Sequence, residues 1–409
     1  MRVAVLGAGY AGLTLARKLE SSLPETADLV VVDESGDHVV QHELHRVVRR
    51  PSVAGDISVA LDEVLDCEVR RATVTGVDPA AGLARLDGAA DLDYDVGAIC
   101  LGAETDFHDI PGLRDHATPL KRLAHAREIR EGFIDVLDSG GRVVVGGAGL
   151  SGVQVAGELA AMRREYEGDE AGAFGGPDGE ATDASHDTEI RLLERLDSVA
   201  PNFPENFQRA VHDQLADRDV DVRTNSAVEA VEADEIDLSG GESLRYDQLL
   251  WTGGIRGPAA LGDERPVVRS DLRLAGDTFV VGDAGRVVDT DGEAAPASAQ
   301  TAIREARVAA KNVRALVEHR LDGGGAFEPR LDRYSYDSPG WLVSVGDGAV
   351  AQVGESVLTG RAALALKTSV GAGYLGSVGA VENAVELVQS ELGLAVDEAD
   401  GGGDDAAEK

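Results

Sequence analysis

Two glycine-rich turns constrain this chain more than any other feature of its sequence. Each follows a short Val-rich or apolar stretch, at 3–6 and at 142–146, and each precedes a helix-like stretch. The glycines are Gly7, Gly9 and Gly12 in the first turn and Gly147, Gly149 and Gly152 in the second. Such a turn lets the backbone approach a pyrophosphate, whose charge the helix N-terminus then holds. A lone turn has an ordinary Gly-rich loop as its alternative, whereas the pair favours two dinucleotide sites.

Each turn also has an acidic partner at the end of the next predicted strand. Asp33 ends the strand after the first turn, and Glu194 ends the corresponding strand after the second. A carboxylate in this place accepts hydrogen bonds from a ribose diol. The second unit is longer because residues 167–188 are acidic, rich in glycine and almost without large apolar side chains. We interpret this segment as a solvated insertion.

A second repeat closes each of these units. The stretches 94–103 and 246–254 both begin with Tyr-Asp and continue through an apolar strand into a turn of small residues. The repeat indicates an α/β protein with two related, Rossmann-like domains. A later strand, 278–281, leads into Gly282, Asp283 and a long helix, which predicts that the chain returns to its first domain.

The predicted organisation has four parts, the last of which is a disordered acidic tail. The third part is expected to contain a β-hairpin around 341–345 and 349–353, followed by helices. The boundaries are 1–115 with 268–328 for the first dinucleotide domain, 116–267 for the second, 329–396 for the C-terminal region and 397–409 for the tail.

The charge of the chain excludes some partners. It carries 38 basic and 74 acidic residues, a net charge of −36, and no basic stripe, which argues against nucleic acid. We interpret the acidity as adaptation to high salt, in which self-repulsion is screened; an ordinary acidic cytosolic protein is the alternative. Unfolding at low salt would separate the two.

The cysteines and apolar runs point to the cytoplasm. Cys67 and Cys100 are the only cysteines and form no Cys-x-x-Cys motif, which is typical of a reduced compartment. No run of about 18 apolar residues occurs, so no membrane span is predicted. The N-terminal stretch 1–19 contains the first turn and is therefore interpreted as a strand and helix rather than a signal peptide.

The order of these motifs resembles the two-dinucleotide-binding-domain flavoproteins, the family that includes the pyridine-nucleotide-disulfide reductases. Within it the sequence is similar to the type II NADH dehydrogenases, which are single-subunit NADH:quinone oxidoreductases. The resemblance covers roughly residues 1–375. The stretches that carry it are 38–44, 102–107, 119–121, 202–205, 251–254 and 299–302.

The resemblance implies FAD in the first site and NADH in the second. Gly7, Gly9 and Gly12 would face the FAD pyrophosphate, Asp33 the adenosine ribose, and Asp283 the ribityl or phosphate groups. Gly147, Gly149, Gly152 and Glu194 would bind NADH. The remaining cofactor-binding positions that the resemblance implies are Gly102, Gly253, Gly282 and Ala299.

The electron acceptor is inferred from the cysteines. A disulfide reductase needs two redox cysteines beside the flavin, and sulfide:quinone reductases also use cysteines, whereas Cys100 lies inside an apolar strand and Cys67 has no partner nearby. Electrons must then leave to an outside acceptor, and the resemblance implies a quinone, expected to be menaquinone.

Coenzyme choice depends on Glu194. Its carboxylate accepts from the ribose hydroxyls of NADH and repels the 2′-phosphate of NADPH, although Arg195 follows directly. The sequence departs from the family at two expected catalytic positions: Gln154 stands where many members have Glu, and Arg304 where they have a second Gln. Gln300, the third expected catalytic residue, is retained; its alternative is a position on the helix surface.

Two further features, a group of three histidines and an apolar stripe near the C-terminus, each have more than one interpretation. His38, His42 and His45 are spaced as metal ligands on one helical face, but no metal is predicted because the resemblance accounts for the segment. The stretch 361–392 carries a modest apolar stripe, with Arg361 and Lys367 as its only basic residues. It favours peripheral membrane contact, with a dimerisation or core-packing face as the alternative.

The expected function is therefore an FAD-dependent NADH:quinone oxidoreductase that does not pump protons, attached peripherally to the cytoplasmic face of the membrane. Two rivals stay open. One is a cysteine-free reductase of the same fold that serves a ferredoxin or a diffusible acceptor, and the other is a flavoprotein redox sensor with little turnover. A homodimer is also left open.

Overall fold

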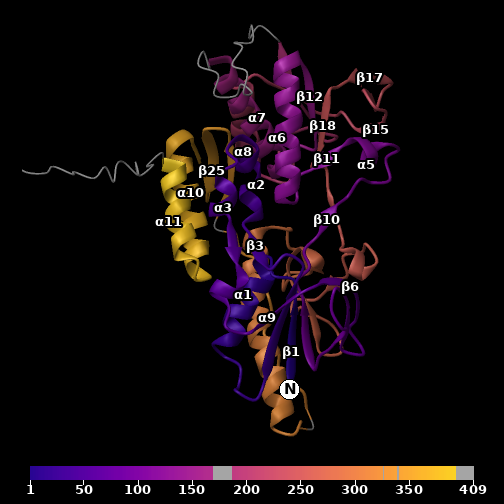
Figure 1. Ribbon diagram of the computed structural model, residues 1–409, viewed down its shortest axis with the longest axis vertical. Helices are drawn as coiled ribbons and strands as arrows, with labels where there is room; N and C mark the ends of the chain where they lie inside the picture. Colours follow the sequence, from indigo (N-terminus) through magenta and orange to yellow (C-terminus); the bar gives the residue numbers. More distant parts are fainter. Residues whose placement is uncertain (169–186, 326, 339, 393–409) are drawn as a thin grey trace, which may run out of the picture.

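The protein contains one mostly parallel and one wholly parallel β-sheet, one above the other along the long axis of the molecule (Figure 1). The computed structural model describes residues 1–168, 187–325, 327–338 and 340–392. The predicted acidic insertion, 167–188, lies almost wholly outside these residues, and the predicted tail, 397–409, lies entirely outside them. The α/β class with two Rossmann-like sheets is confirmed.

The first sheet has the fingerprint strand near its centre. Its order is β21-β22-β9-β1-β2-β5, and all neighbours are parallel except β21 and β22. Both faces are covered, which is why residues 3–6 form a continuous apolar run rather than an alternating one. The strands are β1 (Arg2–Leu6), β2 (Asp28–Asp33), β5 (Glu68–Arg71), β9 (Val96–Ile99), β21 (Arg273–Ala275) and β22 (Thr278–Val280).

Two helices that lie far apart in sequence pack together beside this sheet. They are α1 (Tyr10–Glu20), which follows the first turn, and α9 (Ala299–Leu321), which follows the last strand (Figure 1). Because β22 pairs with β9, the chain returns to the first sheet after leaving it for more than a hundred residues. The predicted return is therefore confirmed.

The second sheet is entirely parallel, in the order β11-β18-β12-β13-β14. Helices cover one face and a small antiparallel sheet covers the other. The strands are β11 (Thr118–Pro119), β12 (Gly141–Gly146), β13 (Thr188–Leu193), β14 (Val220–Arg223) and β18 (Gln248–Trp251). The covering elements are α6 (Leu123–Ser139), α7 (Leu150–Gly168), α8 (Glu205–Ala216), β15 (Val228–Val231), β16 (Glu235–Leu238) and β17 (Glu242–Arg245).

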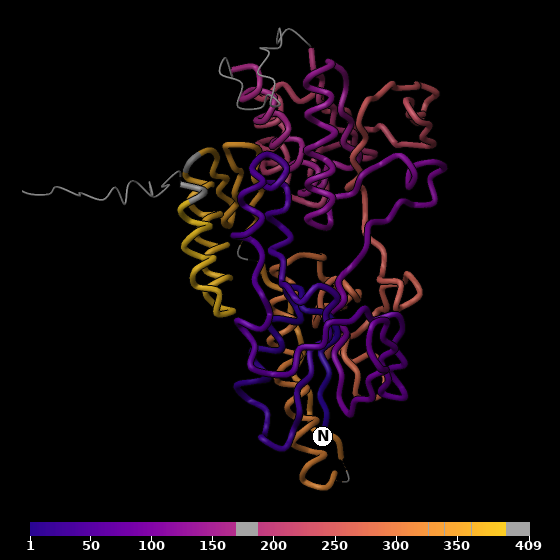
Figure 2. Tube along the Cα trace, viewed as in Figure 1, coloured from indigo at the N-terminus to yellow at the C-terminus, as the bar shows by residue number. Residues whose placement is uncertain are grey.

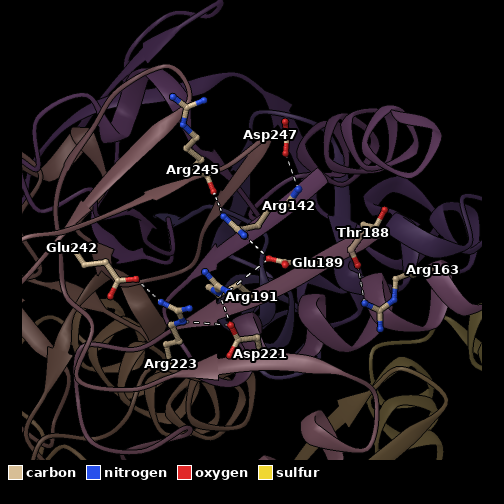
Figure 3. A network of polar contacts seen from close by, with 10 residues as sticks. All are labelled: Arg142, Arg163, Thr188, Glu189, Arg191, Asp221, Arg223, Glu242, Arg245 and Asp247. Carbon is tan, nitrogen blue, oxygen red and sulfur yellow. Dashed lines mark hydrogen bonds and ion pairs between the residues drawn. The ribbon is translucent and has the colours of Figure 1, made fainter. Parts of the chain in front are cut away.

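A ladder of alternating charges crosses the second sheet (Figure 3). Arg142 on β12 contacts Glu189 on β13 at 2.6 Å, and Arg191 contacts Asp221 on β14 at 2.6 Å. Arg223 continues the ladder, with ion pairs to Asp221 and to Glu242 on β17. The ladder runs from Arg142 at the start of β12 to Arg223 at the end of β14, and its charges pair with one another, so we assign it to the stability of the sheet rather than to ligand binding.

The Tyr-Asp repeat has the same role in both sheets. Asp95 accepts a hydrogen bond from the backbone N–H of Arg2 at 2.7 Å, and Asp247 accepts one from the backbone N–H of Arg142 at 2.7 Å. Each aspartate thus ties the start of the closing strand to the start of the fingerprint strand. The repeat predicted from the sequence is a structural repeat.

Short elements connect the two sheets and cover their edges. The pair β10 and β19 is antiparallel and lies between the sheets (Figure 1). These elements are β3 (Asp37–Val39), η1 (Gln41–Glu43), α2 (Leu44–Arg49), α3 (Val53–Asp56), β4 (Ser58–Ala60), α4 (Leu61–Val64), β6 (Thr73–Asp78), β7 (Leu83–Asp87), β8 (Leu92–Asp93), β10 (Glu104–Thr105), α5 (Leu113–His116), β19 (Ile255–Arg256), η2 (Ala259–Leu261), β20 (Val267–Val268), η3 (Gly282–Ala284) and β23 (Arg286–Val287).

The C-terminal region is a three-stranded antiparallel sheet followed by two helices. It packs on α7, α8 and the short helix α3, and the two helices form one outer side of the molecule (Figure 2). The predicted hairpin is confirmed as β24 and β25. The elements are β24 (Gly340–Val345), β25 (Gly348–Val353), β26 (Ser356–Thr359), α10 (Gly360–Ser377) and α11 (Val381–Leu392).

Candidate active site

The first glycine turn forms a cradle that requires glycine at two of its positions. Gly7 has a φ of +94°, and its N–H donates to the Val32 carbonyl at 2.7 Å. A Cβ at Gly12 would lie 1.8 Å from the Gly7 carbonyl oxygen, so α1 can approach the loop only with glycine there. Asp33 stands beside the loop, because its Oδ2 accepts from the Ala8 N–H at 2.9 Å.

The second turn repeats this geometry. Gly147 has a φ of +95°, and a Cβ at Gly152 would lie 1.9 Å from the Gly147 carbonyl oxygen. The Glu194 carboxylate accepts from the Ala148 N–H at 2.9 Å and from the Leu196 N–H at 3.0 Å. Both acidic residues therefore stand at a strand end with their oxygens held beside the loop, where a ribose diol would lie.

Both cradles fit the phosphates of a dinucleotide. A Cβ at Gly9 or Gly149 would meet no protein atom within 4 Å. Helix α1 begins after Gly9 without a side-chain cap or an acidic residue in its first turn, and α7 likewise has no acidic residue there. The first backbone N–H groups of each helix are thus available to an anion.

A buried group of charges surrounds Asp283, which lies in η3 after β22. Burial raises the pKa of Asp283, and the neighbouring Lys121 and Arg265 oppose that rise. Arg265 also donates to the backbone carbonyls of Asp283 and Gly285, at 2.7 and 2.8 Å. The sequence analysis included Lys121 only in the stretch 119–121 that carries the family resemblance, and it did not identify Arg265. The rarity of lysine could have drawn attention to Lys121, which is one of five lysines in the chain.

Glu305 is a second residue that the sequence did not reveal. It lies on α9, is fully buried, and its Oε2 accepts from the Gly282 N–H at 2.7 Å. Burial raises its pKa to about 8. The side chain therefore fixes the turn at Gly282, whose φ of +73° is in the left-handed region.

The start of α9 presents two of the expected catalytic residues. Ala299 and Gln300 are its first residues, the Ser298 hydroxyl caps the Thr301 N–H at 3.1 Å, and Gln300 is partly buried. Arg304 lies one turn later, close enough to Tyr334 and Tyr336 to lower the pKa values that burial raises. Beyond them, Tyr336 stacks on Trp341 at 6.4 Å between ring centres, and Trp341 meets Phe203 edge-on at 5.0 Å.

The remaining expected catalytic residue, Gln154, lies in a different environment. Gln154, on α7, donates to the Ser344 hydroxyl of β24 at 3.2 Å, and that hydroxyl also pairs with His45 Nε2 at 2.9 Å. Among the residues the structure describes, no hydrogen bond joins Gln154 to Gln300 or Arg304. Gly102, with a φ of +67°, and Gly253, whose Cβ would lie 2.5 Å from the Trp251 ring, form the turns after the two closing strands.

The three histidines do not lie on one helical face. His38 is in β3, His42 in η1 and His45 in α2, so their spacing does not place them on a common helix. Each side chain has its own partner: His38 the Ala8 carbonyl and Tyr374, His42 the Tyr10 hydroxyl, and His45 the Ser344 hydroxyl. In the described ranges no group of three or more His, Cys, Asp or Glu side chains could hold a metal ion.

His38 predicts a specific acid sensitivity. Burial lowers its pKa from 6.5 to about 4, so below pH 6.5 the unfolded chain takes up a proton that the folded chain does not. Stability should therefore fall between pH 6.5 and 4, and the His38 share should reach about 2 kcal/mol at pH 5. Urea unfolding at pH 7 and pH 5 measures this share as the difference between wild type and His38→Gln. Equal losses in both proteins would contradict it.

The predicted apolar stripe at 361–392 is divided between two faces. Tyr374, Leu375 and Val378 are buried against the rest of the protein, whereas Val370 and Val381 are exposed. Lys367, one of the two basic residues of the stretch, is buried and its Nζ lies 2.9 Å from Glu43 Oε2. Only part of the stripe therefore faces outward.

Two equivalent cradles on two parallel sheets define a protein with two dinucleotide-binding domains. The sequence model of the family described as pyridine nucleotide-disulphide oxidoreductase matches residues 1–306. The chain belongs to this family. In the described part of the chain, no helix combines the length and apolarity that crossing a membrane requires.

Relatives and solved structures of similar fold extend over nearly the whole chain. A type II NADH:quinone oxidoreductase of Staphylococcus saprophyticus is 23% identical over 395 residues, which cover 90% of this chain and 93% of that protein. The structure of NDH2 from Plasmodium falciparum in complex with NADH has a TM-score of 0.77 at 15% identity, covering 95% of this chain and 98% of that one. The sulfide:quinone oxidoreductase of Aquifex aeolicus has a TM-score of 0.73 at 17% identity, covering 94% and 92%.

Proposed function

We propose that the chain is an FAD-dependent NADH:quinone oxidoreductase, with FAD in the first cradle and NADH in the second. The observation that carries the proposal is the duplicated cradle in a chain without a redox cysteine pair. The similarity to type II NADH:quinone oxidoreductases over 90% of the chain supports it. The overall reaction takes NADH, one proton and a quinone to NAD⁺ and the quinol.

The residues of the first cradle would hold and orient the flavin. Bound FAD supplies the two-electron chemistry between NADH and the acceptor. Gly7, Gly9 and Gly12 leave room for its pyrophosphate, and Asp33 accepts from its ribose. Asp283, with Gly282, lies where the ribityl chain would pass, and Lys121 adds a positive charge beside it. Gly102 and Ala299 complete the proposed set.

The residues of the second cradle would position NADH. Gly147, Gly149 and Gly152 admit the pyrophosphate and Glu194 accepts from the adenosine ribose. Gly253 adjoins this loop, because a Cβ on Gly147 would lie 2.6 Å from the Gly253 Cα. Gln154 projects from the start of α7 and would contact the nicotinamide side of the cofactor. These roles, like the domain boundaries 1–115 with 268–328, 116–267 and 329–396, are part of the proposal.

The thiols support an external acceptor. Burial raises the pKa of both, that of Cys67 to about 12, and Cys67 is raised further by the nearby Glu20 carboxylate. Neither thiol is therefore available as a thiolate near neutral pH, as dithiol chemistry requires. The aromatic group of Phe203, Tyr336 and Trp341, close to Arg304, offers apolar ring surface for a quinone near Gln300. We expect menaquinone.

Peripheral attachment to the cytoplasmic face of the membrane is the proposed location. Val370 on α10, with Val381 and Val385 on α11, exposes apolar surface at the outer side of the helix pair. Three exposed valines with no basic residue described beside them give weak membrane affinity at most, so we expect reversible attachment. A homodimer through the same face is the competing proposal, which vesicle flotation and sedimentation separate.

Acceptor choice tests the proposed function against its rivals. Steady-state oxidation of NADH should be fastest with a soluble menaquinone analogue and should follow ping-pong kinetics. A ferredoxin, being acidic, should react poorly with a chain of charge −36. Faster turnover with ferredoxin or a diffusible dye than with the quinone would favour a different reductase, and negligible turnover with all of them would favour a sensor.

Glu194→Gln should relax the choice of coenzyme. The substitution keeps a carbonyl oxygen that can accept from Leu196 or the ribose, but removes the charge that repels a 2′-phosphate. We expect KM for NADH to rise about tenfold, from the loss of one charge-assisted hydrogen bond, and KM for NADPH to fall. Asp33→Asn, the equivalent change in the other cradle, should leave the ratio of the two KM values unchanged. Equal changes for both coenzymes in Glu194→Gln would refute the assignment.

A further inference from the structure

Helix α10 is linked to the first glycine turn by two hydrogen bonds through His38. The His38 Nδ1 atom lies 3.0 Å from the Ala8 carbonyl oxygen, and its Nε2 atom lies 3.0 Å from the Tyr374 hydroxyl. A carbonyl oxygen only accepts, so Nδ1 must carry the proton and Nε2 must accept from Tyr374. Ala8 also donates its N–H to Asp33 at 2.9 Å, so the central peptide of the turn is held on both sides.

This relay is buried and is reinforced by ring contacts. His38 is 1% exposed and Tyr374 is 8% exposed. Tyr10 follows Gly9 directly, and its ring centre lies 5.3 Å from that of His38 and 5.1 Å from that of Tyr374. Two residues of the turn, Ala8 by its carbonyl and Tyr10 by its ring, therefore contact the pair that connects it to α10.

Helix α11 has an attachment that is separate from the turn. The Asn383 side-chain amide donates to the carbonyls of Asp56 and Ser58, both at 3.2 Å. These contacts hold the helix pair to the same domain but do not touch residues 7–12. They provide a matched control, because breaking them should loosen a helix without disturbing the turn.

We propose that the Tyr374–His38 relay couples FAD occupancy of the first cradle to the docking of helix α10. The proposal rests on the assignment of FAD to that cradle. A pyrophosphate on residues 7–12 restrains the Ala8 carbonyl that His38 binds, so FAD favours the docked helix. By thermodynamic reciprocity, a docked helix favours FAD to the same extent. The outward face of α10 and α11 is then held more firmly in the FAD-loaded protein than in the apoprotein.

Tyr374→Phe tests the first direction of this coupling. It keeps the ring that packs on Tyr10 and removes only the hydroxyl that binds His38. FAD is removed from the full-length protein and titrated back, with flavin fluorescence as the readout. We expect a dissociation constant at least about fivefold higher than that of the wild type, as for the loss of one buried hydrogen bond. Asn383→Ala, which loosens α11 instead, should bind FAD as the wild type does.

Hydrogen exchange tests the reverse direction in the wild-type protein, so the proposal does not depend on how well a variant folds. Adding FAD to the apoprotein should slow amide exchange across 360–377, and this slowing should be lost or much reduced in Tyr374→Phe. The coupling would be overturned if Tyr374→Phe bound FAD with wild-type affinity, or if the rate of amide exchange at 360–377 did not change when FAD was added. Either result would leave the FAD assignment intact. Failure of every protein to bind FAD would overturn the assignment itself.

Discussion

Gly149→Val should abolish the use of NADH while FAD stays bound. Gly149 does not have a positive φ, and a Cβ there would meet no protein atom within 4 Å, so the folded chain tolerates a side chain at this position. The side chain would instead occupy the space where the backbone must approach a pyrophosphate. We expect KM for NADH to rise at least about 100-fold, equivalent to about 3 kcal/mol. Steady-state kinetics and the flavin spectrum of the purified protein measure the two effects.

Gly9→Val, the same substitution in the first cradle, is the matched control for this experiment. It stands at the same place in the first cradle, where a Cβ likewise meets no protein atom within 4 Å. It should yield a folded protein without FAD that still binds NADH, detectable by fluorescence of the bound nicotinamide. Loss of FAD from Gly149→Val, or loss of NADH binding from Gly9→Val, would show that the two cradles are assigned in the wrong order.

Arg49→Met should be among the most destabilising single changes in the chain. Arg49 is the last residue of α2, a helix that packs on α6 and α7 of the second domain. Its guanidinium pairs with Glu158 and Glu165 on α7 and with Asp347 at the β24–β25 turn. The side chain of Glu158 is 7% exposed, whereas those of Glu165 and Asp347 are 42% and 60% exposed and can be hydrated. Removing Arg49 leaves Glu158 buried without its closest cation, at a cost of about 3–5 kcal/mol.

Denaturant unfolding of three variants tests this account of Arg49. The double variant Arg49→Met with Glu158→Met should recover most of the lost stability, because no buried charge is then left unpaired. Arg50→Met removes a neighbour whose side chain is 46% exposed and lies 3.9 Å from Asp347, and should cost less than about 1 kcal/mol. If Arg50→Met costs as much as Arg49→Met, burial of Glu158 is not the reason.

The two cradles could be predicted from the sequence because their determinants are local. Gly12 must be glycine because α1 packs there against the Gly7 carbonyl, and Asp33 ends its own strand. The spacing of these residues in the sequence is therefore enough to predict how they are arranged. The Tyr-Asp repeat could also be predicted from the sequence. Asp95 and Asp247 each accept a hydrogen bond from the start of the strand that precedes the glycine turn in their own sheet. Local patterns of this kind survive without knowledge of the rest of the fold.

The contacts of the C-terminal region could not be predicted in the same way. Lys367 could be read from the sequence only as one of two basic residues in the apolar stretch 361–392, but it is buried against Glu43, more than three hundred residues earlier in the chain. The partner of His38 is Tyr374, at a similar separation. The periodicity of apolar residues indicates that a helix has an apolar face. It does not indicate which polar groups, distant in the sequence, the side chains of that helix will contact.

The central claim is that electrons pass from NADH through one flavin to a quinone. The direct measurement is anaerobic mixing of the purified protein with NADH in molar KCl, followed by a menaquinone analogue, while the flavin absorbance is recorded. We expect one FAD per chain, bleached by NADH and restored by the quinone at rates that match turnover. Absence of bound flavin, or a bleached flavin that the quinone does not reoxidise, would contradict the account.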